Sequence, residues 1–63
     1  MIHQKGEEMD YKLEFTNGSL KTVLYFPDLK QAVECLRDVK RHGGSGRVFV
    51  RGTNGVFERV VAS

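Results

Sequence analysis

The segment Gly43-Gly44-Ser45-Gly46 is the part of the chain whose composition comes closest to a phosphate-binding loop. Such loops place their glycines before a helix, because the unpaired N–H groups and the positive end of the helix dipole then meet the phosphate. Here the glycines follow a segment with helical periodicity, so they would lie at the negative end of the helix. The sequence therefore predicts a helix C-cap and a short loop, completed by Ser45-Gly46, rather than a phosphate site.

Other side chains that could do chemistry are few and scattered. His3, Cys35 and His42 share no spacing typical of a zinc site, so we expect no metal. Cys35 lies beside the apolar stripe of the predicted helix, where a small residue flanking the core explains it. The serines fall in predicted turns and the carboxylates on polar faces, which places no pair for acid–base or nucleophilic work. We expect no enzymatic activity, no cofactor and no small-molecule substrate.

Length and composition indicate one small soluble domain. The chain has 63 residues, of which 40% are hydrophobic and 29% charged. A domain of this size buries little surface, so we expect a marginally stable monomer that favours association. The single cysteine favours a reducing compartment, which predicts a cytoplasmic location. No run approaches the roughly 18 apolar residues of a membrane span, so no membrane contact is expected.

The charge distribution and the N-terminus divide the chain further. The formal net charge is +2, but residues 37–63 carry six basic and two acidic side chains, which points to an anionic partner for this half. Residues 1–9 are polar and lack any periodicity, which predicts a flexible N-terminal arm. The folded domain is expected to comprise residues 10–63.

Alternation of apolar and polar residues predicts a first β-hairpin. One alternating run extends from Tyr11 to Phe15 and a second from Ser19 to Phe26. Asn17-Gly18 between them favours a two-residue type I′ turn, because both central positions of that turn need positive φ. This turn would place Leu13 opposite Thr22 and direct the apolar side of both strands toward the core.

A helix is predicted over residues 29–42. Asp28 is a suitable N-cap, Pro27 ends the preceding strand, and Gly43 supplies the residue that commonly ends a helix. The apolar residues of this segment recur at helical spacing and form one stripe, made of Leu29, Ala32, Val33, Leu36 and Val39.

A second hairpin closes the chain. Its strands are predicted from Arg47 to Gly52 and from Val56 to Ala62, with Asn54-Gly55 as a second type I′ turn. The face expected to contact the helix holds Val48, Val50, Phe57, Arg59 and Val61. The predicted fold is α+β: a two-layer sandwich of order β-β-α-β-β, with one helix on a mainly antiparallel four-stranded sheet.

The residues also carry a resemblance to known proteins. The order of strand, Asn-Gly turn, strand, a helix containing Ala32-Val33-Glu34, then Gly43-Gly44 and a closing strand and Asn-Gly turn over residues 47–57 resembles a family of small bacterial proteins of unknown function. The resemblance covers about residues 11–60. Members often carry a tryptophan near the start, where this chain has Tyr11. The resemblance implies the hairpin–helix–hairpin layout and no activity.

The sheet face away from the helix is the strongest candidate for function, because a single helix covers only one side of a sheet. Basic, aromatic and aliphatic side chains are expected to alternate there; they are Lys12, Lys21, Val23, Tyr25, Arg47, Phe49, Arg51 and Val60.

Three interpretations of this face stay open. Val23, Tyr25, Phe49 and Val60 could form an apolar patch that a second copy or another protein covers, at the open face or at a strand edge. Aromatic rings interleaved with lysine and arginine also suit the stacking of unpaired bases, with cations on the phosphates. Alternatively, these residues are simply good strand formers alternating with solvated charges. We predict an interaction or regulatory module, with homodimerisation or a protein partner preferred and nucleic-acid binding as the alternative.

Overall fold

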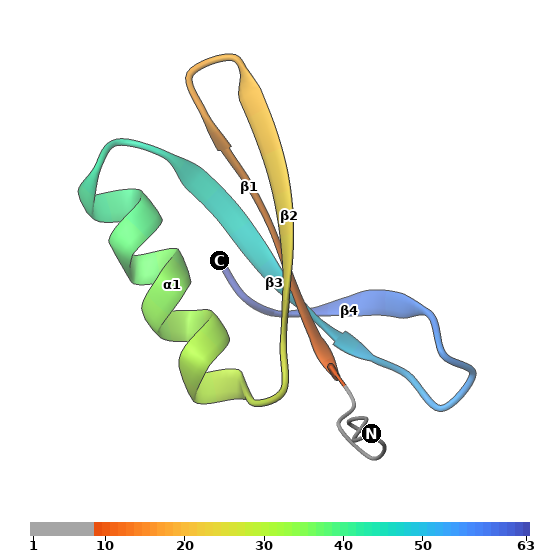
Figure 1. Cartoon of the computed structure of the whole chain (residues 1–63). Coiled ribbons are helices and arrows are strands. Elements are labelled where there is room, and N and C mark those ends of the chain that lie inside the picture. The colour runs from red at the N-terminus through yellow and green to blue at the C-terminus, as the bar shows by residue number, and fades with distance from the viewer. Residues whose placement is uncertain (1–8) are drawn as a thin grey trace, which may run out of the picture.

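The computed structural model describes residues 9–63 and contains four strands and one helix (Figure 1). These elements are β1 (Tyr11–Asn17), β2 (Leu20–Phe26), α1 (Leu29–Arg41), β3 (Ser45–Arg51) and β4 (Phe57–Ala62). The strands form one antiparallel sheet of order β2-β1-β3-β4, and α1 packs mainly over β1 and β3. The predicted α+β fold of order β-β-α-β-β is therefore confirmed. The predicted arm at residues 1–9 lies outside the described residues except for Met9.

The first hairpin has the predicted faces but a different register. Leu13 lies opposite Leu24, and the strands are joined through Gly18-Ser19 rather than Asn17-Gly18. Gly18 has a φ of +70°, whereas Ser19, like every other non-glycine residue in the described part, does not have a positive φ. That pattern fits a type II′ turn, which needs a left-handed residue only at its first central position, so the predicted type I′ turn is wrong. Because the slip is two residues, every side chain keeps its face.

Both ends of α1 are capped. The Asp28 carboxylate accepts a hydrogen bond from the Gln31 N–H at 3.0 Å, as expected of an N-cap. At the other end Gly43 has a φ of +90°, the Gly43 N–H donates to the Lys40 carbonyl, and the Gly44 N–H donates to the Val39 carbonyl. This pair of bonds is the Schellman arrangement. The helix ends one residue earlier than predicted, with His42 as its C-cap.

The second hairpin differs more from the prediction. β3 begins at Ser45, so Ser45-Gly46 belongs to the strand and not to the preceding loop. In the connection to β4, the Gly55 N–H donates to the Gly52 carbonyl and Gly55 has a φ of +85°, which indicates a three-residue loop with a glycine bulge in place of type I′.

The pairing of β3 with β4 contains two register shifts, one between Val50 and Arg51 and one between Val48 and Phe49. The three-residue loop places Phe57 opposite Arg51, on the face away from α1, and beyond the second shift Ala62 lies opposite Val48, against the core. The predicted position of Phe57 on the helix-facing side is therefore wrong, and Ala62, not Val61, is the residue that lies opposite Val48. Each bulge inserts an extra residue and reverses the alternation beyond it.

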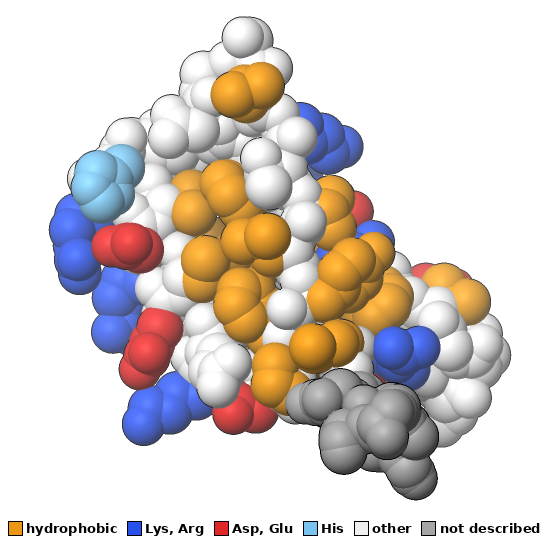
Figure 2. Space-filling model, in the orientation of Figure 1, with side chains coloured by type: hydrophobic (Ala, Val, Ile, Leu, Met, Phe, Trp, Pro, Cys, Tyr) orange, Lys and Arg blue, Asp and Glu red, His pale blue; other side chains and the backbone are white. Residues whose placement is uncertain are grey.

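The core lies between α1 and the two central strands. Leu13, Ala32, Leu36 and Val48 are buried, and Leu13 pairs with Leu24 on one side and with Val48 on the other. Figure 2 shows hydrophobic side chains gathered over the middle of this view, with charged side chains along the outer side of α1. In the described part of the chain, α1 is too short and too polar to cross a membrane.

Candidate interaction surface

The residues expected on the face away from α1 do lie there. Lys12 sits between Tyr25 of β2 and Phe49 of β3, and Phe49 lies opposite Val60 of β4. The whole face, which we call the open face, carries the predicted set of Lys12, Lys21, Val23, Tyr25, Arg47, Phe49, Arg51 and Val60, with Glu14 and Phe57 in addition. The alternation of the first strand predicts Glu14 on this face as well, although not among the candidate residues, whereas Phe57 was predicted on the other face.

Lys12 is the centre of a cluster of aromatic rings and charges. Its ammonium group lies 5.2 Å from the ring centre of Phe49 and 5.4 Å from that of Phe57, and it forms an ion pair with Glu14 at 3.1 Å. These contacts leave the Lys12 side chain only 19% exposed. Cations over ring faces are attracted by the ring quadrupole, and the attraction grows as water is removed. Lys12 therefore stabilises this end of the sheet and is not a solvated cation.

The sheet curls over its open face at the same end. The rings of Tyr25 on β2 and Phe57 on β4 are 5.7 Å apart, although two strands separate their own strands in the sheet. Figure 1 shows the cause, since β4 crosses the direction of β2 at a wide angle. Strong right-handed twist brings opposite edges of a sheet closer on one face. We call Lys12, Tyr25, Phe49, Arg51 and Phe57 together the aromatic cluster.

Arg51 is also held by internal contacts. Its guanidinium carbon lies 4.9 Å from the ring centre of Phe57, and its side chain donates a hydrogen bond to the Met9 carbonyl at 3.0 Å. A longer contact of 3.5 Å joins it to the Asp10 carboxylate. Two of the four cations expected to face a partner, Lys12 and Arg51, are thus bound within the chain.

The importance of the Lys12 contacts leads to a first prediction. Lys12→Met keeps the aliphatic stem and removes the charge, so it is expected to lower the free energy of unfolding by about 1 kcal/mol. Lys30→Met is the matched control, because Lys30 is an exposed lysine of α1 that lies outside both the aromatic cluster and β2, and it should change stability by less than about 0.5 kcal/mol. Urea denaturation of both variants measures the difference. Equal stabilities of the two variants would contradict this role of Lys12.

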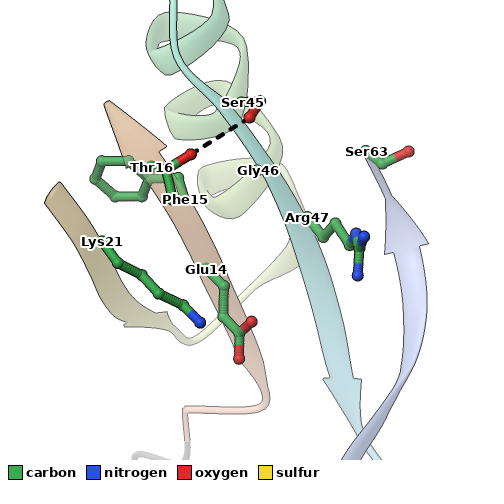
Figure 3. A pocket seen from close by; sticks show the side chains of 8 residues that line it. All are labelled: Glu14, Phe15, Thr16, Lys21, Ser45, Gly46, Arg47 and Ser63. Carbon is green, nitrogen blue, oxygen red and sulfur yellow. Dashed lines mark hydrogen bonds between the residues drawn. The ribbon is translucent and has the colours of Figure 1, made fainter. Parts of the chain in front are cut away.

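A shallow groove of about 380 Å³ occupies the other end of the sheet (Figure 3). In this view Lys21 points toward Glu14, whereas Arg47 points toward the end of β4, and the hydroxyls of Thr16 and Ser45 are 3.4 Å apart. The lining mixes both charge signs with small hydroxyls. It therefore offers no concentrated positive field for an anion and no enclosed apolar volume for a small molecule.

The outer edge of β2 has no neighbouring strand to pair with its backbone N–H and C=O groups. β2 is an edge strand of seven residues, and its pairing with β1 is regular over the whole length. Its exposed apolar side chains are Leu20 at 71%, Val23 at 40%, Leu24 at 38% and Tyr25 at 52%. Long regular edge strands with exposed apolar side chains are templates for pairing with another chain. This edge adjoins the open face through Val23 and Tyr25.

The remaining candidates for chemistry do not form a site. Cys35 packs against the core, and its burial, together with the nearby Asp38 carboxylate, raises the pKa of the thiol, which makes it a poor nucleophile near neutral pH. The His42 ring nitrogen lies 2.9 Å from the Asp38 carbonyl at the end of the helix. Within residues 9–63 no three His, Cys, Asp or Glu side chains gather as metal ligands would, and His3 lies outside this range.

Comparison with known proteins adds no assignment to this geometry. The chain matches no protein-family model, no curated protein and no solved structure. The resemblance to small bacterial proteins of unknown function therefore stays a prediction.

Proposed function

We propose that the chain is a small, non-enzymatic interaction module that self-associates through the outer edge of β2. The observation that carries this proposal is the edge itself, which is seven residues long, regularly paired on its inner side, and rich in exposed apolar side chains. Val23 and Tyr25 extend the interface onto the open face. Covering this edge removes apolar surface from water and satisfies backbone groups at the same time.

The size of the core supports association as well. The fully buried side chains of the described chain are few, and the two larger ones that are wholly inaccessible are Leu13 and Val48. Small domains with so little buried surface commonly gain stability from oligomerisation. Because α1 packs mainly over β1 and β3, it leaves apolar side chains of β2 exposed, and a second copy would cover them.

The nucleic-acid alternative has less support. Stacking of bases requires accessible ring faces, but Phe49 is half-buried, and Phe57 has both Lys12 and Arg51 over its ring. The exposed cations Lys21 and Arg47 share the groove with Glu14. Of the three rings on this face only Tyr25 is exposed, and a base would have to displace internal cation–π contacts to stack on Phe49 or Phe57.

A cytoplasmic location belongs to the same proposal. The single thiol, Cys35, is compatible with a reducing compartment, and the fold does not depend on a disulfide. Fractionation of cells that express the chain with a small tag tests the location independently of the interface.

Self-association predicts a melting temperature that depends on protein concentration. Dimerisation stabilises the folded state by mass action, so each tenfold increase in concentration should raise the melting temperature by about 3–6 °C for a chain of this size. Calorimetry over a hundredfold concentration range, combined with sedimentation equilibrium, measures both quantities. A monomeric mass together with a constant melting temperature over this range would contradict the proposed function.

Salt separates the two classes of partner. For each phosphate contact, the logarithm of the binding constant falls by about 0.7–0.9 when the salt concentration rises tenfold. The affinity of an apolar strand interface depends little on salt. We therefore expect the dimer mass to persist from low to moderate salt. We also expect no binding of a labelled single-stranded oligonucleotide at low salt. Oligonucleotide binding with a steep salt slope would favour the nucleic-acid alternative.

A further inference from the structure

The backbone hydrogen bonds determine which groups of β2 point outward. The Arg51 N–H donates to the Asp10 carbonyl at 2.8 Å, so Asp10 directs its backbone toward β3. Because backbone groups of an antiparallel strand alternate between its two neighbours, Tyr11, Leu13 and Phe15 bond with β2. Their partners on β2 are Phe26, Leu24 and Thr22. The N–H and C=O groups of Lys21, Val23 and Tyr25 therefore point away from the sheet.

Both ends of this outward row are closed. Ser19 belongs to the turn, and Pro27, the next residue in the outward series, has no N–H to donate. The row available for pairing is thus Lys21, Val23 and Tyr25. Its midpoint is Val23.

The other exposed edges of the described sheet are less suited to pairing. β4 contains the extra residues of two register shifts and carries Glu58 and Arg59 side by side, and both bulges and charges oppose edge-to-edge pairing. β4 also covers only part of β3, since its pairing ends with Ala62 opposite Val48. The uncovered stretch of β3 offers one outward residue, Gly46.

We propose that β2 pairs antiparallel with β2 of a second copy of this chain, about a two-fold axis that passes through Val23. This inference rests on the proposed function and adds the partner strand and the register. Val23 would lie opposite its own counterpart, and Lys21 would lie opposite Tyr25 of the second copy. Each opposed pair then exchanges both backbone hydrogen bonds, and the two sheets become one continuous sheet of eight strands with both helices on the same side.

The side chains match in this register. Lys21 meets the ring of Tyr25 on the open face, which suits a cation–π contact. On the opposite face Thr22 meets Leu24, and Leu20, the most exposed apolar side chain of the strand, meets Phe26. The two copies of Lys21, the charged residue of β2, stand about 14 Å apart along the strands, so their repulsion is screened.

Neighbouring registers satisfy fewer backbone groups. A slip of one residue would place residues whose backbone groups point outward opposite residues whose backbone groups point toward β1, so no hydrogen bonds could form between the two strands. A two-fold axis at Thr22 leaves the outward groups of Tyr25 unpaired, and an axis at Leu24 opposes Lys21 to Pro27. The Val23 axis is the arrangement in which all three outward residues are paired.

Disulfide trapping tests the register. In a Cys35→Ala background, single-cysteine variants Lys21→Cys, Val23→Cys and Tyr25→Cys are oxidised separately and in pairwise mixtures, and covalent dimer is measured by non-reducing electrophoresis. Directly opposed residues lie within disulfide reach, whereas residues displaced by four positions do not. We expect Val23→Cys alone to cross-link. We also expect the Lys21→Cys and Tyr25→Cys mixture to cross-link, while neither of those variants does so alone.

The pattern of cross-links separates this inference from the proposed function. Cross-links between Val23→Cys and either neighbour, without the Val23→Cys homodimer, would overturn the Val23 axis and leave self-association through β2 intact. A protein that sediments as a dimer but cross-links at none of these positions would show that β2 is not the interface, which contradicts both. A protein that stays monomeric would also contradict both.

A proline variant checks the backbone component. Val23→Pro removes an N–H that points outward, which an edge strand tolerates, so the monomer should keep its circular dichroism spectrum. The dimer loses two hydrogen bonds, and its dissociation constant should rise about tenfold or more. Val23→Thr is the matched control, since it keeps the β-branched shape and the N–H. Equal dissociation constants for the two variants would overturn the pairing, and Val23→Cys trapping decides the matter if the proline variant does not fold.

Discussion

Replacing Leu36 by alanine is expected to lower the free energy of unfolding by about 2–5 kcal/mol, which is comparable to the whole stability of a small domain. Leu36 is 4% exposed and lies at the centre of the helical stripe, against Leu13 and Val48. Alanine would leave a cavity that the short helix and the paired strands can fill only in part. The variant should be unfolded or molten at room temperature, as measured by amide chemical shift dispersion.

Leu29→Ala is the matched control for this substitution. Leu29 belongs to the same apolar stripe but is 39% exposed, so its truncation removes less buried surface. We expect it to keep a cooperative melt. If Leu36→Ala melted cooperatively at the wild-type midpoint, the stripe would not be the centre of the core.

Gly46→Ala is expected to lower the free energy of unfolding by about 1–3 kcal/mol, although it adds a single methyl group. A Cβ at this position would lie 2.7 Å from the Glu14 carbonyl oxygen and 2.7 Å from the Phe15 Cβ. Both contacts involve β1, which cannot shift without disturbing its pairing with β2 and β3. The cost is therefore steric, because this glycine does not have positive φ.

Gly52→Ala provides the comparison. Its Cβ would lie 3.2 Å from the Asn54 side-chain oxygen and 3.4 Å from the Val56 carbonyl oxygen, contacts that a loop can relieve. The lower entropy of the unfolded alanine chain offsets part of the strain, so we expect a change below about 0.5 kcal/mol. Chemical denaturation of the two variants measures the difference. Equal effects would indicate that β1 and β3 approach each other less closely than described.

The faces of the first three strands could be predicted from the sequence, because the period of two is encoded in each strand by itself. Tyr11, Leu13 and Phe15 face the core as predicted, and the helix follows from its apolar stripe and its caps. The pairing of strands is a different matter, since it depends on the conformation of the loop. Asn17-Gly18 is compatible with a type I′ turn at these two residues and also with a strand that ends at Asn17 and a turn at Gly18-Ser19. The second arrangement places Leu13 between Leu24 and Val48 in the core.

The aromatic cluster could be predicted only in part, for a related reason. Lys12, Tyr25, Phe49 and Arg51 lie on the open face as expected, but Phe57 joins them because the three-residue loop displaces it by one position from the predicted register. The twist that brings Tyr25 to Phe57 is a property of the whole sheet. Sequence alternation therefore gave the right face for these side chains except Phe57, and it could not show that cations already lie over the rings of Phe49 and Phe57.

Amide hydrogen exchange along β2 tests the central claim most directly, because it reports which backbone groups are paired. The Thr22 and Leu24 amides bond with β1, so they should exchange slowly at every protein concentration. The Lys21, Val23 and Tyr25 amides point outward and should exchange rapidly in dilute solution, then become protected as concentration rises. This concentration-dependent protection of alternate residues is the result that pairing through β2 predicts. Rapid exchange at Lys21, Val23 and Tyr25 up to the highest soluble concentration would contradict it.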